Sequence, residues 1–242
     1  MYVEEHQGRD PATVWLHHGV GSTRSWDRFL PAGAGGRRAV VYDRDGFGRS
    51  THGRKLTTAM FDEDVADLEV MLTERGGEPV HLIGHSDGGT VALLLAARAP
   101  ALVLSIALVS VHIRGDATTV ATLRRMGPPD QWPEPMRRSL RRDHGDDWLE
   151  VASAWYALWT SSAWERWSIV DELPAVACPV FAMHALRDDL APRLHVDTIR
   201  DALPASRITW VETSAHDPHR VQPERFAADL ESLWRDAEHR DG

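Results

Sequence analysis

Residues Ile83 to Thr90 read "IGHSDGGT" and follow the apolar run "PVHL". Glycines two residues before and two residues after Ser86 make the G-x-S-x-G pattern of a nucleophile elbow, a sharp turn from a strand into a helix. The next residues, "GTVALLLAARA", read as a helix. This context predicts that Ser86 is a nucleophile at the carboxyl end of a sheet, whereas the alternative is a serine in an ordinary glycine-rich loop.

Short apolar runs alternate with helix-like segments along much of the chain. Such runs are typical of strands buried on both faces of a parallel sheet, while residues 58–75 place Phe61, Val65, Leu68 and Leu72 on one helical face. The alternation predicts an α/β fold with a doubly wound, mostly parallel sheet. The strands are expected at residues 12–18, 38–43, 79–84, 104–110, 178–184 and 207–212.

Residues 114–171 break this alternation, because they contain no strand-like run and are rich in proline, arginine and tryptophan. We expect them to form a helical cap inserted between two strands, with residues 1–113 and 172–242 as the core. Trp155 and Trp159 are expected to line an aromatic pocket over Ser86, which favours a bulky apolar or aromatic substrate. The arginines of "MRRSLRRDHG" favour a solvated helix face, and the alternative is a landing site for a phosphate-bearing acyl thioester.

Composition limits the classes of function. The 242 residues suit one domain with an insertion, and a formal net charge of -9 argues against a nucleic-acid partner. Cys178 is the single cysteine, so no disulfide can form within the chain, which indicates a reducing compartment. We find no signal-peptide pattern and no membrane-spanning run, and we expect a cytoplasmic protein with a small-molecule substrate and no membrane partner.

A serine hydroxyl becomes a strong nucleophile when a histidine accepts its proton and a carboxylate orients that histidine. In this fold the chain order is serine, acid, histidine. Asp188 and Asp189 follow one predicted strand, and His216 and His219 follow the next. The order is therefore satisfied, with one choice open between the aspartates and another between the histidines.

The chain resembles the α/β-hydrolase superfamily over nearly its whole length. It is most similar to the branch with an S-D-G-G elbow, which includes biphenyl-hydrolase-like serine hydrolases. The similarity rests on the elbow and on "LHHGVGSTRSW", "YDRDGFGRS", "CPVFAMHALRDDLAP" and "SAHDPHRVQPERF". It implies Asp188 as the acid, His216 as the base, and the backbone N–H groups of Val20 and Asp87 as the oxyanion hole.

The chain departs from the family pattern in three places. Ala185 and Ala215 stand where the pattern has glycine, so we expect altered loop geometry with function retained. A short segment precedes the run "ATVWLHH", so the leading antiparallel hairpin is expected to be truncated or absent.

Two of the histidines, His18 and His219, are expected to contact substrate or to support the pocket. No carboxylate or cysteine stands at a familiar metal spacing from them, so neither a metal nor a cofactor is expected. The side chain of Asp87 has two interpretations. It turns away and accepts hydrogen bonds, or it lines the pocket and pairs with a cationic substrate group.

The predicted reaction is hydrolysis of an ester-like bond through an acyl-enzyme on Ser86. A serine at the elbow argues against haloalkane dehalogenase and epoxide hydrolase chemistry, in which the family uses an aspartate nucleophile. The alternatives are a thioesterase, a carbon–carbon bond hydrolase, a cofactor-free perhydrolase, a non-hydrolytic tailoring enzyme and a ligand-binding protein. Monomer and homodimer are both compatible with the sequence.

Overall fold

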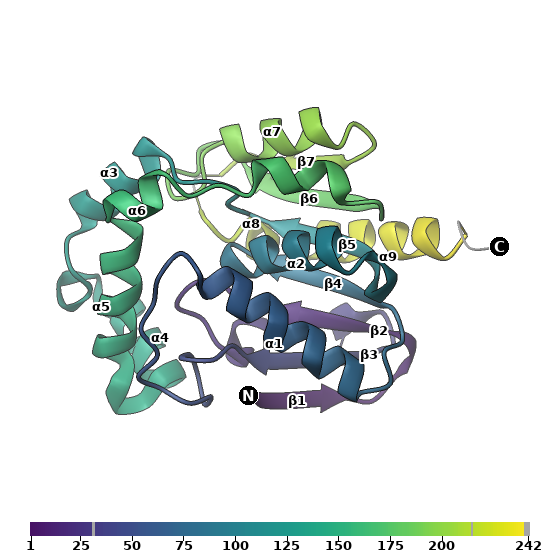
Figure 1. Ribbon diagram of the computed structural model, residues 1–242, viewed down its shortest axis with the longest axis horizontal. Coiled ribbons are helices and arrows are strands. Elements are labelled where there is room, and N and C mark those ends of the chain that lie inside the picture. Colours follow the sequence, from purple (N-terminus) through teal and green to yellow (C-terminus); the bar gives the residue numbers. More distant parts are fainter. Residues whose placement is uncertain (31, 214, 240–242) are drawn as a thin grey trace.

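The elbow lies on a seven-stranded sheet in the computed structural model, which describes residues 1–30, 32–213 and 215–239 (Figure 1). The strand order is β1-β3-β2-β4-β5-β6-β7, with β1 antiparallel to β3 and the other neighbours parallel. The strands are β1 (Tyr2–His6), β2 (Arg9–Leu16), β3 (Arg37–Asp43), β4 (Val80–His85), β5 (Val103–Val109), β6 (Val180–Ala185) and β7 (Arg207–Val211).

The six predicted strands are present as β2 to β7, with ends that shift by a few residues. The predicted helix at residues 58–75 is α1, and the helix after the elbow is α2. The leading hairpin was expected to be truncated or absent. The structure has a leading strand, β1, which pairs antiparallel with β3 over its whole length and forms the edge of the sheet. The helices are α1 (Met60–Glu74), α2 (Asp87–Arg98), α3 (Ala117–Met126), α4 (Glu134–His144), α5 (Trp148–Trp159), α6 (Ser162–Glu165), α7 (Leu194–Ala202), α8 (Pro218–Val221) and α9 (Pro223–Glu238).

Both faces of the sheet are buried, as the continuous apolar runs predict. Successive strand residues alternate between two cores: Leu82 of β4 packs with α1 and α2, whereas its neighbour Ile83 packs with α9. Figure 1 shows α1 and α2 on one face of the sheet and α9 on the other. Helices on both faces leave the carboxyl ends of the strands as the edge where loops can form a site.

Helices α3 to α6 lie between β5 and β6 in sequence and form a separate group beside the sheet (Figure 1). They fall inside residues 114–171, which we call the cap. Four of its tryptophans stack in series: the ring centroids of Trp155 and Trp159 are 4.7 Å apart, those of Trp159 and Trp164 3.9 Å, and those of Trp164 and Trp167 4.6 Å. Trp167 stacks at 4.6 Å on Phe61 of α1, so the series joins the cap to the core.

Within residues 1–30, 32–213 and 215–239, the structure has no helix with the length and apolar character needed to span a lipid bilayer.

We predict that Trp164→Ala lowers the free energy of unfolding by about 3–5 kcal/mol, because Trp164 is fully buried and its loss opens a cavity in the aromatic series. The measurement is the urea unfolding midpoint. Trp148→Ala is the matched control, since Trp148 is half-buried beneath Arg141 and should cost much less. Equal losses for the two variants would contradict the structural role of the series.

Candidate active site

Ser86 occupies the turn between β4 and α2 with φ 54° and ψ -118°, a left-handed conformation that is strained for a residue with a side chain. Two glycines make the turn possible. A Cβ on Gly84 would lie 2.4 Å from Gly88 O, and a Cβ on Gly88 would lie 2.4 Å from Leu16 O. The glycines therefore let the strand and helix backbones pass closely, and the serine is held at the carboxyl edge of the sheet.

Asp87 begins α2 directly after Ser86, where a backbone N–H has no acceptor within its own helix. Its side chain is buried and accepts a hydrogen bond from Trp155 Nε1 at 3.2 Å, while the Arg44 guanidinium lies 3.8 Å away. Burial raises the pKa of Asp87 to about 6, although Arg44 acts in the opposite direction. These contacts support the first of the two interpretations, in which the carboxylate turns away from the pocket.

The loop after β2 contains His18, Gly19 and Val20, and its carbonyl groups accept hydrogen bonds from Arg44 and His144. Arg44 Nη2 donates to His18 O at 3.2 Å and lies 3.4 Å from Gly19 O, and His144 Nε2 donates to Val20 O at 2.9 Å. Because the peptide unit is planar and trans, the Val20 N–H points away from Gly19 O and hence away from the buried Arg44. Val20 also lines the pocket.

His216 and Asp188 form a hydrogen-bonded pair in which the Nδ1–H of His216 donates to Asp188 Oδ2 at 2.8 Å. The other carboxylate oxygen of Asp188 accepts the backbone N–H groups of Leu190 and Ala191 at 2.9 and 3.0 Å. Asp189, in contrast, is exposed and lies 3.7 Å from Arg125. The structure therefore brings Asp188, and not its neighbour, to His216.

The pair has opposite effects on its two pKa values. Burial alone would lower the pKa of His216, but the charge of Asp188 and its hydrogen bond raise it above the usual value. Burial alone would raise the pKa of Asp188, but His216 and the backbone N–H of Ala191 hold it far below the usual value. A carboxylate that stays ionised beside an imidazole of raised pKa is what a general base requires.

His112 is a neighbour of Ser86 that the sequence reasoning missed. Its Nδ1 lies 3.3 Å from Ser86 Oγ, and its Nε2 donates to Leu190 O at 2.6 Å. One feature of the sequence could have pointed to His112. It lies two residues after the predicted strand 104–110, at the edge of the sheet where open α/β folds bind their ligands.

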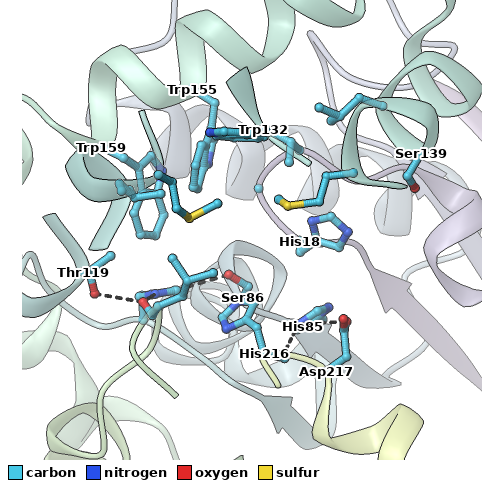
Figure 2. A pocket seen from close by; sticks show the side chains of 18 of the residues that line it. His18, His85, Ser86, Thr119, Trp132, Ser139, Trp155, Trp159, His216 and Asp217 are labelled. Carbon is cyan, nitrogen blue, oxygen red and sulfur yellow. Dashed lines mark hydrogen bonds and ion pairs between the residues drawn. The ribbon is translucent and has the colours of Figure 1, made fainter. Parts of the chain in front are cut away.

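A pocket of about 260 Å³ separates the cap from the elbow. Figure 2 shows Ser86, His85 and His216 on one side of this pocket and Trp132, Trp155 and Trp159 on the other. His18 lines it too, so three of the four residues expected to contact substrate face the pocket. The lining also has apolar side chains, Leu123, Met126, Met136, Leu140 and Leu190, and charged ones, Asp143, Asp217 and Arg220.

His219 is the exception and corrects our expectation that it contacts substrate. Its ring is buried behind His85, 5.0 Å away between centroids, and packs on Trp26 and Phe29. It supports the floor of the pocket through these contacts.

The residues that could hold a metal, within the described ranges, are His85, Asp217 and His219, whose ligand atoms lie within 4.8 Å of one another. The Nε2–H of His85, however, donates to His216 O at 3.0 Å, and Arg220 Nε lies 3.7 Å from Asp217 Oδ1. This donor set is better suited to supporting the His216 loop than to binding a cation, because a bound metal would displace both contacts.

Three of the four arginines of α4 have acidic neighbours. Arg137 and Arg141 pair with Glu134 at 2.9 and 3.0 Å, and Arg142 pairs with Asp143 at 2.8 Å. This pairing supports the interpretation of a solvated helix face, since much of its charge is neutralised locally.

An elbow serine, a His–Asp pair and a helix N-terminus at the carboxyl edge of a doubly wound sheet define a hydrolase-like site. The chain belongs to the alpha/beta hydrolase fold family, which matches residues 12–168, and this confirms the resemblance noted from the motifs. It is similar to the serine hydrolase BPHL of Mus musculus, with 25% identity over 206 residues that cover 81% of this chain and 68% of the relative.

Two solved structures show the same fold. One is the esterase EaEST from Exiguobacterium antarcticum, with a TM-score of 0.75 and 18% identity over 97% of this chain and 95% of that chain. The other is a bromoperoxidase from Bacillus anthracis, with a TM-score of 0.75 and 20% identity over 96% of this chain and 94% of that chain. At these identities the likeness concerns the fold alone.

We predict that Asp188→Asn lowers the pKa of His216, because the neutral amide no longer stabilises the imidazolium while burial still disfavours it. An NMR titration of the His216 ring measures this shift. In the control Asp189→Asn the pKa should not change, since the Asp189 side chain is exposed and beside Arg125. Equal shifts in the two variants would show that the geometric assignment of the acid is wrong.

Proposed function

We propose that this α/β-hydrolase cleaves an ester-like bond in a small molecule through an acyl-enzyme on Ser86. The observation that carries the proposal is the His216–Asp188 hydrogen bond of 2.8 Å at the pocket that Ser86 also lines. The mouse relative is named a serine hydrolase, which agrees with a serine nucleophile. No step in this chemistry needs a cofactor.

In the proposed acylation, Ser86 Oγ attacks the carbonyl carbon while His216 Nε2 takes the hydroxyl proton. Asp188 keeps the proton of His216 on Nδ1, which leaves Nε2 free to act as the base. The carbonyl oxygen becomes an oxyanion, and the N–H groups of Val20 and Asp87 are directed to stabilise it. His216 then donates the proton to the leaving alcohol, and a water molecule later releases the acid by the same steps in reverse order.

The pocket supports an apolar or aromatic substrate group. Trp132, Trp155 and Trp159 form its cap side, and leucine and methionine side chains fill much of the rest. Besides Ser86 and the histidines, the polar lining residues are Thr119, Ser139, Asp143, Asp217 and Arg220. Such groups set the orientation of a substrate whose binding comes from burial of apolar surface.

We predict that a fluorophosphonate probe labels the wild-type protein and that Ser86→Ala abolishes the labelling. Mass spectrometry of the modified peptide identifies the labelled residue. Folded wild-type protein that stays unlabelled would refute the serine-hydrolase proposal and favour a ligand-binding protein. A panel of aryl esters, alkyl esters, thioesters and lactones then identifies the bond that is cleaved.

We predict that Asp188→Asn reduces turnover of the best ester by roughly 10⁴-fold with the fold preserved, because the imidazole then adopts the wrong tautomer. Asp189→Asn should cost far less, since Asp189 lies outside the His216 pair. The measurement is kcat at saturating substrate, with circular dichroism as the check on folding. A larger loss at Asp189 than at Asp188 would overturn the assignment.

A further inference from the structure

Ser86 Oγ has an imidazole partner that is not the proposed base. The distance from Ser86 Oγ to His112 Nδ1 is 3.3 Å, and within the described residues no hydrogen bond joins Ser86 to His216. His112 and His216 both face the pocket, with ring centroids 5.8 Å apart. The serine hydroxyl carries one proton, so it cannot donate to His112 and to His216 at the same time.

The contacts of His112 settle which of its nitrogens carries hydrogen. A carbonyl can only accept, so the 2.6 Å contact with Leu190 O requires the proton on Nε2. In the neutral ring Nδ1 is then an acceptor, and the 3.3 Å contact is a bond donated by the Ser86 hydroxyl. The ring is 2% exposed and meets Trp159 edge-on at 4.6 Å between centroids, so packing fixes its orientation as well.

The surroundings of His112 oppose its protonation. Burial holds its pKa well below the usual value, and the nearby His195 and His216 act in the same direction, against a smaller effect of Asp188. His112 is thus an acceptor that holds the hydroxyl but is a poor base for removing its proton. His216 differs because Asp188 is hydrogen-bonded to its ring.

We infer that His112 is a positioning residue that holds the Ser86 hydroxyl in a resting orientation, from which it must turn to His216 before acylation. This inference rests on the proposed function, since it assumes that Ser86 is the nucleophile and His216 the base. Two consequences follow for the free enzyme. Breaking the bond to His112 adds to the acylation barrier, and His216 lacks a hydrogen bond from serine that would stabilise its neutral form.

The variant that tests this is His112→Leu, with His112→Asn as its conservative partner. Leucine removes the acceptor, whereas the Oδ1 of asparagine can occupy the place of Nδ1. In the leucine variant the donor left near Leu190 O is the Thr119 hydroxyl, 2.8 Å away, whose one proton Leu190 O shares with Asp116 Oδ2. His195→Gln is the control for disturbance of the same buried cluster, because His195 lies 5.2 Å from His112 between centroids and contacts Asp116.

We predict that His112→Leu raises kcat/KM for acylation by about two- to tenfold, the size expected from losing one competing hydrogen bond. The acid limb of the kcat/KM profile should move to lower pH, because the released hydroxyl donates to His216 and favours the neutral ring. His112→Asn and His195→Gln should retain the wild-type profile. Leucine also makes the surroundings of His216 less polar, which by itself lowers an imidazole pKa, so the nitrogen spectra described below assign the shift to the lost acceptor.

The pH effect can be assigned to His112 because the other ionisable neighbours of His216 stay in place. They are Asp188 in the loop after β6, Asp217 in its own loop, Asp87 of α2, and the histidines His18, His85, His184 and His219. None of them is changed in the leucine or the asparagine variant.

A direct measurement on the wild-type protein keeps the inference testable if His112→Leu does not fold. Long-range ¹H–¹⁵N spectra should show His112 with its proton on Nε2 and a hydrogen-bonded Nδ1. In Ser86→Ala, the Nδ1 signal of His112 should move toward that of an unbonded acceptor, with little change at His216 Nε2. A change at His216 Nε2 and none at His112 would overturn the inference.

The outcomes separate this inference from the proposed function. If the fluorophosphonate probe fails to label the wild type, the proposed function fails, whatever the imidazole spectra show. If the probe labels Ser86 but Ser86→Ala perturbs His216 alone, the hydrolase proposal stands and the role of His112 is wrong.

Discussion

The buried guanidinium of Arg44 connects most of the parts that make up the site. It is 1% exposed, pairs with Asp64 of α1 at 2.7 Å, reaches the carbonyl groups of His18 and Gly19, and lies 3.8 Å from Asp87. One charge at the end of β3 therefore links α1, the loop after β2 and the N-terminus of α2. Both Nη atoms of this buried guanidinium meet acceptors, whereas its Nε has no hydrogen-bond partner among the described residues. The Nη contacts fix the relative positions of these elements.

The cap shares this network, so its position depends on the loop that carries the proposed oxyanion donors. Trp155 donates to Asp87, and His144 donates to Val20 O while accepting the Gly48 N–H at 2.9 Å. Trp167 stacks on Phe61, and Arg24 donates to Arg142 O at 2.6 Å. These contacts join the cap to the core at separate places. A displacement of the cap would therefore change the oxyanion loop as well as the substrate volume.

The fold and the three proposed catalytic side chains could be predicted because their signals are local. The strands are continuous apolar runs, the elbow needs glycines at fixed spacing, and chain order restricts the acid and the base. The choice between Asp188 and Asp189 depends on which carboxylate turns inward to the N–H groups of Leu190 and Ala191. Asp188 and Asp189 are adjacent, so the sequence around them does not distinguish one from the other. The choice was open until the family pattern indicated Asp188.

What could not be predicted depends on contacts between distant segments. Asp87 is turned by Arg44 and Trp155, which lie 43 residues before it and 68 residues after it in the chain, and no local pattern encodes that pairing. His219 has the spacing of an H-x-x-H pair with His216, yet the aromatic contacts with Trp26 and Phe29 draw it behind the floor. His112 is similar, because its role follows from meeting Ser86 and Leu190 O at once.

Several histidines surround Ser86, and electrostatics distinguishes them more clearly than distance. Burial lowers the pKa of His18 and of His85 to about 3, and it holds that of His112 well below the usual value. His216 is buried too, but its Nδ1 is bonded to a carboxylate that is itself held ionised by backbone N–H groups. Proximity to the hydroxyl is thus not enough to make a base. The proposed base is the imidazole whose positive charge the protein is already arranged to stabilise. We infer for the same reason that His112, hydrogen-bonded to the Ser86 hydroxyl, holds the serine without activating it.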